Sequence, residues 1–442
     1  MDTIKKIGEF QKFGSRLGLE RMTKLMDLLD NPQEGLNYIH VGGTNGKGSV
    51  CWYIYSVLRA NGYNVGMFTS PFMDGFRQAI IVDDVFMTKA ELDANYAAIE
   101  EAVDKMKEEG FDSPTEFEII TALSLLYFKS RNPDFVIMEV GLGGIGDSTN
   151  IIGKPLVSVI TSVSLDHCDV LGETIEAIAL EKAGIIKEQT TVVSNVDGEA
   201  AKVIAREAYK KSAPLIDATK YKAVGTLVDF DGNRFTVSID GISYPDMQTS
   251  LPGAHQIKNA ICALTVIEQL RKKAKITLDK DATQKGLKNA KPEGRMEIIN
   301  NDPLVILDGA HNAEGAKALA QYMVSFFSDK KVLTIFSLMK DKEPENVIDE
   351  FVKFSDELII ADVLEDKPVD ARGLLDITQD KVRNSTEWHI QIDPSAIRII
   401  TDEASLLSTI KENSHSGSGF DIVLITGSLY LIRQLRPSLI NL

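Results

Sequence analysis

The sequence contains little cysteine and comparatively little positive charge. Its three cysteines, Cys51, Cys168 and Cys262, are far apart and form no CxxC pair. This pattern argues against a cysteine zinc site or a redox dithiol, and it favours a reducing, cytoplasmic setting. Only 48 lysines and arginines face 64 aspartates and glutamates, which gives a net charge of −16. Because nucleic acids and anionic membranes bind positively charged surfaces, we expect neither as a partner.

Long apolar runs are also missing. No window approaches the roughly 18 uninterrupted apolar residues of a membrane-spanning helix, and the first residues carry charges throughout. We therefore expect a protein without a membrane span or targeting segment. What remains is a globular composition, with 44% hydrophobic residues over 442 positions, and this length predicts two or three domains.

Apolar runs alternate with amphipathic stretches along the first half of the chain. This alternation is typical of βα units around a mostly parallel sheet. The patterns predict strands at 36–41, 64–70, 134–140 and 156–162, and helices at 49–60, 88–110, 115–129 and 175–183. Asp-Gly pairs then break the segment 215–251 into short alternating stretches, which predicts a small antiparallel patch.

A second βα series follows a predicted helix at 254–272. Its strands are expected at 305–310, 331–337, 357–363 and 421–427. We therefore predict an α/β protein in two parts. Residues 1–296 would form a P-loop nucleotide-binding domain with a mostly parallel sheet and the antiparallel patch, and residues 297–442 a smaller Rossmann-like α/β domain.

A glycine-rich loop lies between the first predicted strand and helix. It comprises Gly43, Thr44, Asn45, Gly46, Lys47, Gly48 and Ser49. Backbone N–H groups of such a loop curl around phosphate oxygens, the lysine adds a charge, and the serine hydroxyl can hold Mg²⁺. The loop departs from GxxxxGK[ST], because Val41 stands at its first position and Gly48 separates Lys47 from Ser49. The position between strand and helix nevertheless favours a phosphate site over a simple turn.

A buried acid is expected beside this loop. The stretch DFVIMEV predicts a strand that delivers Glu139 at its carboxyl end, where α/β sheets bind their ligands. An acid in this position can bind the Mg²⁺ of a nucleotide, although many such acids are simply solvated.

A dinucleotide fingerprint also occurs, since residues 141–146 satisfy GxGxxG and Asp166 follows 20 positions later. Gly153 and Pro155 leave no room for the helix that this fingerprint must open, so we do not expect a dinucleotide site.

Ten motifs together resemble the folylpolyglutamate synthase/dihydrofolate synthase family, and they occur in the family's order over almost the whole chain. They are HVGGTNGKGS (40–49), TSPF (69–72), EVGLGG (139–144), SLDH (164–167), EKAGII (181–186), HQIKNA (255–260), Gly294-Arg295, LDGAHN (307–312), MKDK (339–342) and TGSLYL (426–431). That family belongs with the muramyl ligases. Only about 40 residues precede the loop, too few for the extra domain of the muramyl branch, which favours the folate branch.

The resemblance implies an ATP-dependent ligase that adds L-glutamate to the γ-carboxylate of a folate or folylpolyglutamate through an acyl phosphate. Dihydrofolate synthase activity, with dihydropteroate as acceptor, is also implied. The substrates would be small molecules, and we expect a monomer. The matched positions imply two Mg²⁺ sites, one with Ser49 and Glu139 and one with Ser70, Glu139 and His167.

The resemblance also implies roles for residues outside the loop. Lys182 matches a lysine that is carbamylated, whereas from the sequence alone it would be a solvated charge late in a helix. Asn259 and Arg295 match nucleotide contacts. Asp308 and His311 match residues that face ATP and the incoming glutamate, and with Lys47 and Lys182 they form the expected catalytic set. Closure of the two domains would complete the site.

Several positions differ from the family pattern. They include Phe72, the pair Ile145-Gly146 in place of arginine and leucine, and Pro292-Glu293 in place of tryptophan and proline. The pattern thus predicts ligation more directly than the choice of acceptor. Three alternatives remain: a Mur-type amide ligase with another carboxylate acceptor, a non-catalytic ATP-binding paralogue, and a nucleic-acid motor, which the charge disfavours.

Overall fold

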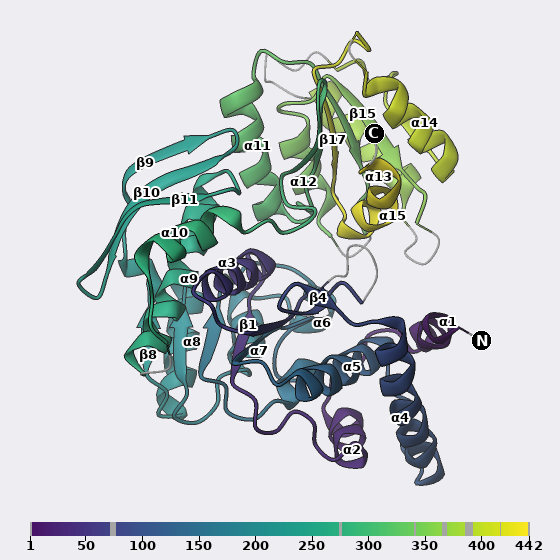
Figure 1. Cartoon of the computed structure of the whole chain (residues 1–442). Helices are drawn as coiled ribbons and strands as arrows, with labels where there is room; N and C mark the ends of the chain where they lie inside the picture. Colours follow the sequence, from purple (N-terminus) through teal and green to yellow (C-terminus); the bar gives the residue numbers. More distant parts are fainter. Residues whose placement is uncertain are drawn as a thin grey trace.

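The computed structural model describes residues 2–70, 77–273, 276–339, 342–364, 369–384, 392–415 and 417–440. Phe72 of the TSPF motif and Lys340 and Asp341 of the MKDK motif lie outside these ranges. The described strands form three sheets, of eight, three and six strands (Figure 1). Among the described residues, no helix has both the length and the apolar character needed to cross a membrane.

The first sheet has the strand order β4-β3-β2-β5-β1-β6-β7-β8. Its strands are β1 (Tyr38–Gly42), β2 (Val65–Phe68), β3 (Ile80–Val82), β4 (Val85–Phe86), β5 (Phe135–Glu139), β6 (Val157–Ile160), β7 (Thr191–Ser194) and β8 (Leu215–Asp217). The central strand β1 pairs in parallel with β5 and β6 and is buried along its length, as expected for a sheet covered on both faces. The loop after β1 and the acid ending β5 therefore emerge side by side.

Helices cover this sheet. They are α1 (Thr3–Gly8), α2 (Glu20–Leu28), α3 (Lys47–Ala60), α4 (Lys89–Glu108), α5 (Glu116–Arg131), α6 (Cys168–Leu171), α7 (Ile175–Ala183) and α8 (Gly198–Lys210), with short 3₁₀ turns η1 (Glu9–Phe13), η2 (Ser148–Ile151) and η3 (Ala218–Lys220). Capping boxes at Thr88 and Thr115 start α4 and α5, because each threonine accepts from the backbone N–H three residues on. The segment after the GxGxxG motif forms η2, as expected for a sequence that cannot open a dinucleotide helix.

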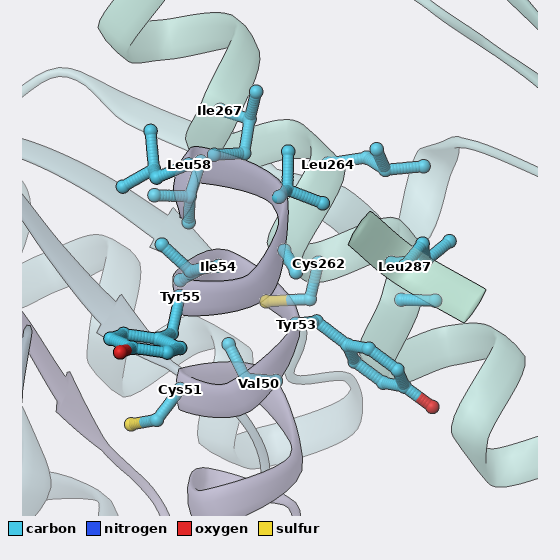
Figure 2. Packing of buried hydrophobic residues seen from close by; sticks show 14 of the residues in the cluster. Val50, Cys51, Tyr53, Ile54, Tyr55, Leu58, Cys262, Leu264, Ile267 and Leu287 are labelled. Carbon is cyan, nitrogen blue, oxygen red and sulfur yellow. The ribbon is translucent and has the colours of Figure 1, made fainter. Parts of the chain in front are cut away.

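The antiparallel sheet consists of β9 (Val224–Asp229), β10 (Gly232–Ile239) and β11 (Ile242–Thr249). The predicted patch began too early, because β8 pairs in parallel with β7 and belongs to the large sheet. Two helices follow, α9 (Ala254–Lys272) and α10 (Lys280–Asn289). Figure 2 shows side chains of α3 and α9, including Ile54 and Leu264, packed in one buried cluster with Leu287 of α10. This packing ties α9 to the helix that begins at the phosphate loop.

The C-terminal sheet has the order β12-β13-β17-β14-β15-β16. Its strands are β12 (Glu297–Asn301), β13 (Leu304–Leu307), β14 (Val332–Phe336), β15 (Glu357–Ala361), β16 (Arg398–Ile400) and β17 (Ile422–Thr426), and its helices are α11 (Ala313–Phe327), α12 (Pro344–Phe351), α13 (Ala371–Asn384), α14 (Glu403–Asn413) and α15 (Leu429–Leu439). All pairs are parallel except β12 with β13. The predicted fold class, two α/β domains with a small antiparallel sheet, is confirmed.

The two domains touch away from the linker. The turn between β9 and β10 reaches α11, where the Tyr322 hydroxyl donates to the backbone oxygen of Phe230 at 2.5 Å (Figure 1). The first strand of the C-terminal sheet begins at Glu297. The division between residues 296 and 297 itself stays a prediction.

Candidate active site

The glycine-rich loop folds tightly against the loop that follows β6. The Thr44 N–H donates to the Ser162 oxygen at 2.9 Å, and the Asn45 N–H donates to the Ser162 hydroxyl at 2.8 Å. Gly43 has φ +146°, and a Cβ there would lie 2.0 Å from Thr161 Oγ1. Only glycine fits such a position without moving the backbone. The loop is thus held in one shape, with the N-terminus of α3 at its end.

Two lysines converge on this loop. Lys47 Nζ donates to the carbonyl oxygens of Gly43 and Thr44, at 3.1 and 3.0 Å. Lys182, from the end of α7, is buried and donates to the same Gly43 oxygen at 3.0 Å. Burial, reinforced by the charge of Lys47, lowers the pKa of Lys182 to about 7. Lys182 is therefore not the solvated helix-end charge that the local sequence alone suggests.

Glu139 lies buried at the end of β5, next to the start of α3. Its Oε2 accepts from the Ser70 backbone N–H at 3.1 Å, and a Cβ on Gly48 would lie 3.8 Å from the same oxygen. Burial raises the pKa of Glu139 to about 7, although the nearby charge of Lys47 opposes the shift. A desolvated carboxylate beside a helix N-terminus is suited to bind a cation.

Ser49 and Asn259 meet through a residue that the sequence reasoning did not single out. Gln256 Nε2 donates to the Ser49 hydroxyl at 3.3 Å, and Gln256 Oε1 accepts from Asn259 Nδ2 at 3.1 Å. Asn259 also lies against the loop, since a Cβ on Gly46 would be 2.6 Å from its Oδ1. Gln256 and Asn259 both come from the first two turns of α9, so this helix lines the loop.

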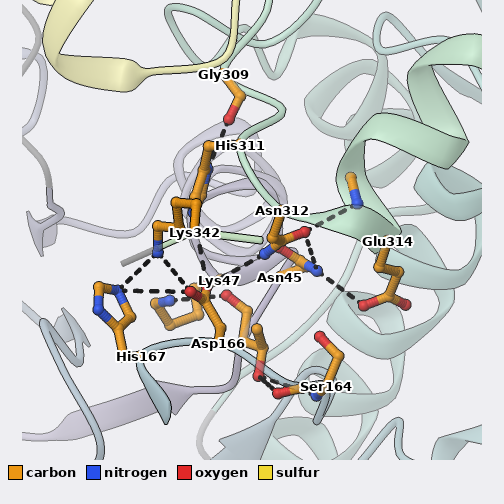
Figure 3. A network of polar contacts seen from close by, with 12 residues as sticks. Asn45, Lys47, Ser164, Asp166, His167, Gly309, His311, Asn312, Glu314 and Lys342 are labelled. Carbon is orange, nitrogen blue, oxygen red and sulfur yellow. Dashed lines mark hydrogen bonds and ion pairs between the residues drawn. The ribbon is translucent and has the colours of Figure 1, made fainter. Parts of the chain in front are cut away.

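A polar cluster joins the two domains at Asp166 (Figure 3). Its carboxylate pairs with Lys342 of the C-terminal domain, accepts from Asn312 Nδ2 at 3.2 Å, and lies 3.6 Å from His311 Nε2. Burial opposes ionisation of Asp166, but the hydrogen bond from His311 and the charge of Lys342 together hold its pKa well below the usual range. His167 Nε2 lies 3.2 Å from Lys342 Nζ, so this predicted metal-binding residue belongs to the same cluster.

The phosphate loop itself contacts the C-terminal domain. Asn312 Nδ2 donates to Asn45 Oδ1 at 3.0 Å, and Asn45 Nδ2 donates to Glu314 Oε2 at 2.8 Å (Figure 3). Asn312 is also the N-cap of α11, because its side chain accepts from the Gly315 N–H. The DGAHN segment therefore lies directly over the loop.

Arg295 and Asp308 lie where the chain crosses between the domains. Arg295 Nη1 donates to the Gly309 oxygen at 3.4 Å. The Asp308 carboxylate accepts from the N–H groups of Met296 and Ala310, at 2.9 and 3.0 Å. Loss of solvation raises the pKa of Asp308, and the charge of Arg295 opposes this shift. The positive charge of Arg295 also acts on Glu139 and opposes the rise in its pKa.

The predicted site residues that the structure describes therefore lie on the loop or in the polar contacts around it. Within the described part of the chain, no three His, Cys, Asp or Glu side chains form a metal-binding cluster. The predicted metal sets also contain the hydroxyls of Ser49 and Ser70, which are not among these four residue types. The sequence reasoning missed Gln256, Asp166, Asn312 and Lys342 as site residues, although all four stand inside the quoted motifs.

Family models match both domains of the chain. The model described as "Mur ligase middle domain" matches residues 41–267, and the model described as "Mur ligase, glutamate ligase domain" matches residues 294–429. The first match includes the phosphate loop, and the second includes the DGAHN segment.

Individual relatives agree with these models. The chain is 38% identical to a dihydrofolate synthase/folylpolyglutamate synthase from Bacillus subtilis, over 97% of this chain and 96% of the relative. It is similar to a Mycobacterium tuberculosis folylpolyglutamate synthase solved with ADP and AMPPCP, with a TM-score of 0.87, 26% identity and coverage of 99% and 98%. A solved complex of folylpolyglutamate synthase (FPGS) with AMPPCP and folate gives a TM-score of 0.80 and 30% identity, over 99% of this chain and 100% of that one.

These similarities extend over at least 96% of each of these relatives and include both halves of the site. The predicted family is thereby confirmed. The chain belongs to the Mur ligase family of ATP-dependent ligases, within its folylpolyglutamate synthase/dihydrofolate synthase branch.

Proposed function

We propose that the protein adds L-glutamate to the γ-carboxylate of tetrahydrofolate or folylpolyglutamate, with conversion of ATP to ADP and phosphate. One observation carries the proposal: the phosphate loop of one domain lies within hydrogen-bond distance of the DGAHN segment of the other, at the Asn45–Asn312 contact of 3.0 Å. ATP bound at the loop and the glutamate amine bound at the DGAHN segment would meet at this contact. The relatives with bound AMPPCP and folate support both substrates.

ATP would bind with its phosphates in the loop from Gly43 to Ser49. Lys47 would turn from the loop carbonyls to the phosphate oxygens, which bind an ammonium more strongly than neutral carbonyls do. Asn259, already against Gly46, and Arg295, at the domain crossing, would contact the nucleotide. These assignments rest on the family motifs and on the positions of the side chains around the loop.

The donor set beside the loop fits Mg²⁺. Ser49 is a buried hydroxyl in the first turn of α3, and Glu139 is a buried carboxylate at the end of β5 beside it; oxygen donors are what Mg²⁺ prefers. We propose that these two hold the nucleotide Mg²⁺, and that Ser70, Glu139 and His167 hold a second one. Bound there, the ion would neutralise charge on the phosphates and on the reacting carboxylate. His167 would first have to part from Lys342.

Lys182 is proposed to carry a carbamate. Its lowered pKa leaves an amine that is partly uncharged near neutral pH, and an uncharged amine is the form that attacks CO₂. The N–C bond forms and one proton leaves the amine. The product is a negatively charged carbamate in place of a basic amine. This negative charge would suit a site that binds a second cation.

The reaction would proceed in two steps. The folate γ-carboxylate attacks the γ-phosphorus of ATP, giving an acyl phosphate and ADP. The glutamate amine then attacks the acyl carbon, phosphate leaves, and a proton is lost from the amine. Asp308 and His311 face this region and are proposed to orient ATP and glutamate. The close approach of the two domains would keep water from the acyl phosphate.

Dihydropteroate is a second candidate acceptor, since the Bacillus subtilis relative is named for both activities. We further propose a cytoplasmic monomer, without nucleic acid or membrane partners, with the domain boundary at residues 296 and 297. The unpaired Cys51, Cys168 and Cys262 are in accord with a reducing compartment.

A phosphate-release assay tests the proposal. The protein is supplied with Mg-ATP and L-glutamate, and tetrahydrofolate or dihydropteroate is varied. We expect tetrahydrofolate to stimulate release and to gain one glutamyl residue by mass, with D-glutamate as the matched control substrate. Stimulation by dihydropteroate would add the second activity. Release that neither acceptor stimulates would contradict the folate assignment.

A further inference from the structure

Arg436 forms an ion-pair cluster with two acids on either side of the Gly294-Arg295 motif. It lies on α15, with only 10% of its side chain exposed. Its Nε is 3.1 and 3.0 Å from the two carboxylate oxygens of Glu297, and its Nη2 is 2.8 Å from Glu297 Oε1 and 3.0 Å from Glu293 Oε1. One guanidinium thus binds two acids that stand four residues apart.

These acids flank the turn that carries Arg295. Gly294 has φ +64° and Met296 has φ +46°, so both neighbours of Arg295 adopt the left-handed conformation. A non-glycine residue such as Met296 enters this conformation at a cost, and it persists only where surrounding contacts enforce it. Backbone strain of this kind is concentrated at functional sites.

The enforcing contacts lead back to Arg436. Glu297 Oε2, which Arg436 binds, also accepts from the Gly294 N–H at 2.8 Å. On the other side, the Gly294 oxygen accepts from the Gly309 N–H at 2.9 Å. The carboxylate of Glu297 therefore closes the turn, and Arg436 fixes the direction of that carboxylate.

We propose that Arg436 is a positioning residue that acts through Glu297 and Glu293 to aim Arg295 at the nucleotide. This inference rests on the proposed function, because it assigns Arg295 to the nucleotide. The Arg295 guanidinium at the domain crossing must hold its position to within a fraction of an ångström to contribute binding energy. A linker with two left-handed residues has no helix or strand of its own to supply that accuracy.

The test is a double-mutant cycle on nucleotide affinity. AMPPCP binding with Mg²⁺ is measured by calorimetry for the full-length wild type, Arg436→Met, Arg295→Ala and the double variant. We expect Arg436→Met and Arg295→Ala each to raise the dissociation constant about tenfold, and the double variant to be no weaker than Arg295→Ala alone. Arg436→Lys, which keeps the charge but loses the two-pronged contact, should recover part of the affinity.

Controls separate this role from general stability. Arg398→Met breaks an ion pair of the same domain, 3.3 Å from Glu357, and should leave AMPPCP affinity unchanged. If Arg436→Met does not fold, Glu293→Gln removes one arm of the cluster and should raise the dissociation constant about threefold.

Additive losses in the cycle, or unchanged affinity in Arg436→Met, would overturn the inference. A wild type that does not bind AMPPCP would instead overturn the proposed function.

Discussion

Lys47 and Lys182 donate to the same oxygen, the carbonyl of Gly43, at 3.1 and 3.0 Å. Two ammonium groups at one acceptor repel each other, and Lys182 is also buried. The structure therefore holds Lys182 in a place where its charge is disfavoured. An arrangement that costs stability at the phosphate loop is typical of a functional site.

The first prediction concerns the replacement of Lys182 by methionine. The pKa of Lys182 is about 7 in the folded chain and 10.5 when unperturbed, so between these values the unfolded chain binds more protons. Stability from this site therefore rises as pH increases from 7 to 10.5. We expect Lys182→Met to abolish ligase activity and to raise the melting temperature at pH 6, by an amount equivalent to at most roughly 5 kcal/mol, and less at pH 10.

Lys187→Met is the matched control. Burial lowers the pKa of Lys187 to about 8, and its amine donates to the Asn150 oxygen at 3.1 Å, not to the loop. Lys187→Met should therefore also raise the melting temperature more at low pH than at high pH, as Lys182→Met does, but it should retain ligase activity. Equal loss of activity in both variants would argue against a specific role for Lys182.

The second prediction concerns Glu139. Burial raises its pKa to about 7, so between the usual 4.5 and 7 the folded chain holds a proton that the unfolded chain has lost. Stability from this group is full below pH 4.5 and is lost as pH rises through 7. Glu139→Gln should therefore raise the melting temperature of the ligand-free protein at pH 8. It should also weaken Mg-ATP binding by calorimetry, on the order of 100-fold. Unchanged Mg-ATP affinity would remove Glu139 from the metal site.

The third prediction concerns Gly43. An added methyl group would meet Thr161 Oγ1 at 2.0 Å and the Thr161 and Ser162 nitrogens at 3.1 Å, so the loop must shift. We expect Gly43→Ala to raise the KM for ATP on the order of 100-fold in the phosphate-release assay. Gly153→Ala, where no atom lies within 4 Å, should behave like the wild type. A Gly43→Ala enzyme with normal KM would show that the loop does not bind the phosphates.

The fourth prediction concerns the ion pair that joins the domains. The side chains of Asp166 and Lys342 are 8% and 6% exposed, so removal of one partner takes from the other the opposite charge that offsets its loss of solvation. Asp166→Asn and Lys342→Met should each lower the melting temperature, and the double variant should lower it less than their sum, with a coupling of about 1–3 kcal/mol. Lys381 forms a more exposed ion pair with Asp349, at 2.8 Å, and Lys381→Met should change the melting temperature little. Full additivity would show that the pair does not couple the domains.

Local sequence predicted the larger elements well, because their signals are local. The bounds of α7 and α9 match the predicted 175–183 and 254–272, and the capping box at Thr88 starts α4 as expected. The structure also contains α10, which was not among the predicted elements. Gly286 weakens the helical pattern there, but it allows α10 to approach α3 so closely that a Cβ would lie 2.6 Å from the Ser56 oxygen.

The site was predictable only as a set of motifs. The phosphate loop and Glu139 follow from strand ends and glycines, which are features of neighbouring residues. The pairing of Asp166 with Lys342 joins positions 176 apart, and no spacing rule connects them. The burial of Lys182 likewise comes from the docking of α7 on the loop, which the helix sequence does not encode by itself.

The contact between Tyr322 and Phe230 has a consequence for how the sequence can change. Phe230 contributes its main-chain oxygen, which every amino acid possesses, whereas Tyr322 contributes a phenol hydroxyl. Substitutions at position 230 that keep the turn should leave this bond between the domains in place, but even phenylalanine at 322 would remove it. The tolerance of the two partners to mutation is therefore unequal, although they share a single hydrogen bond.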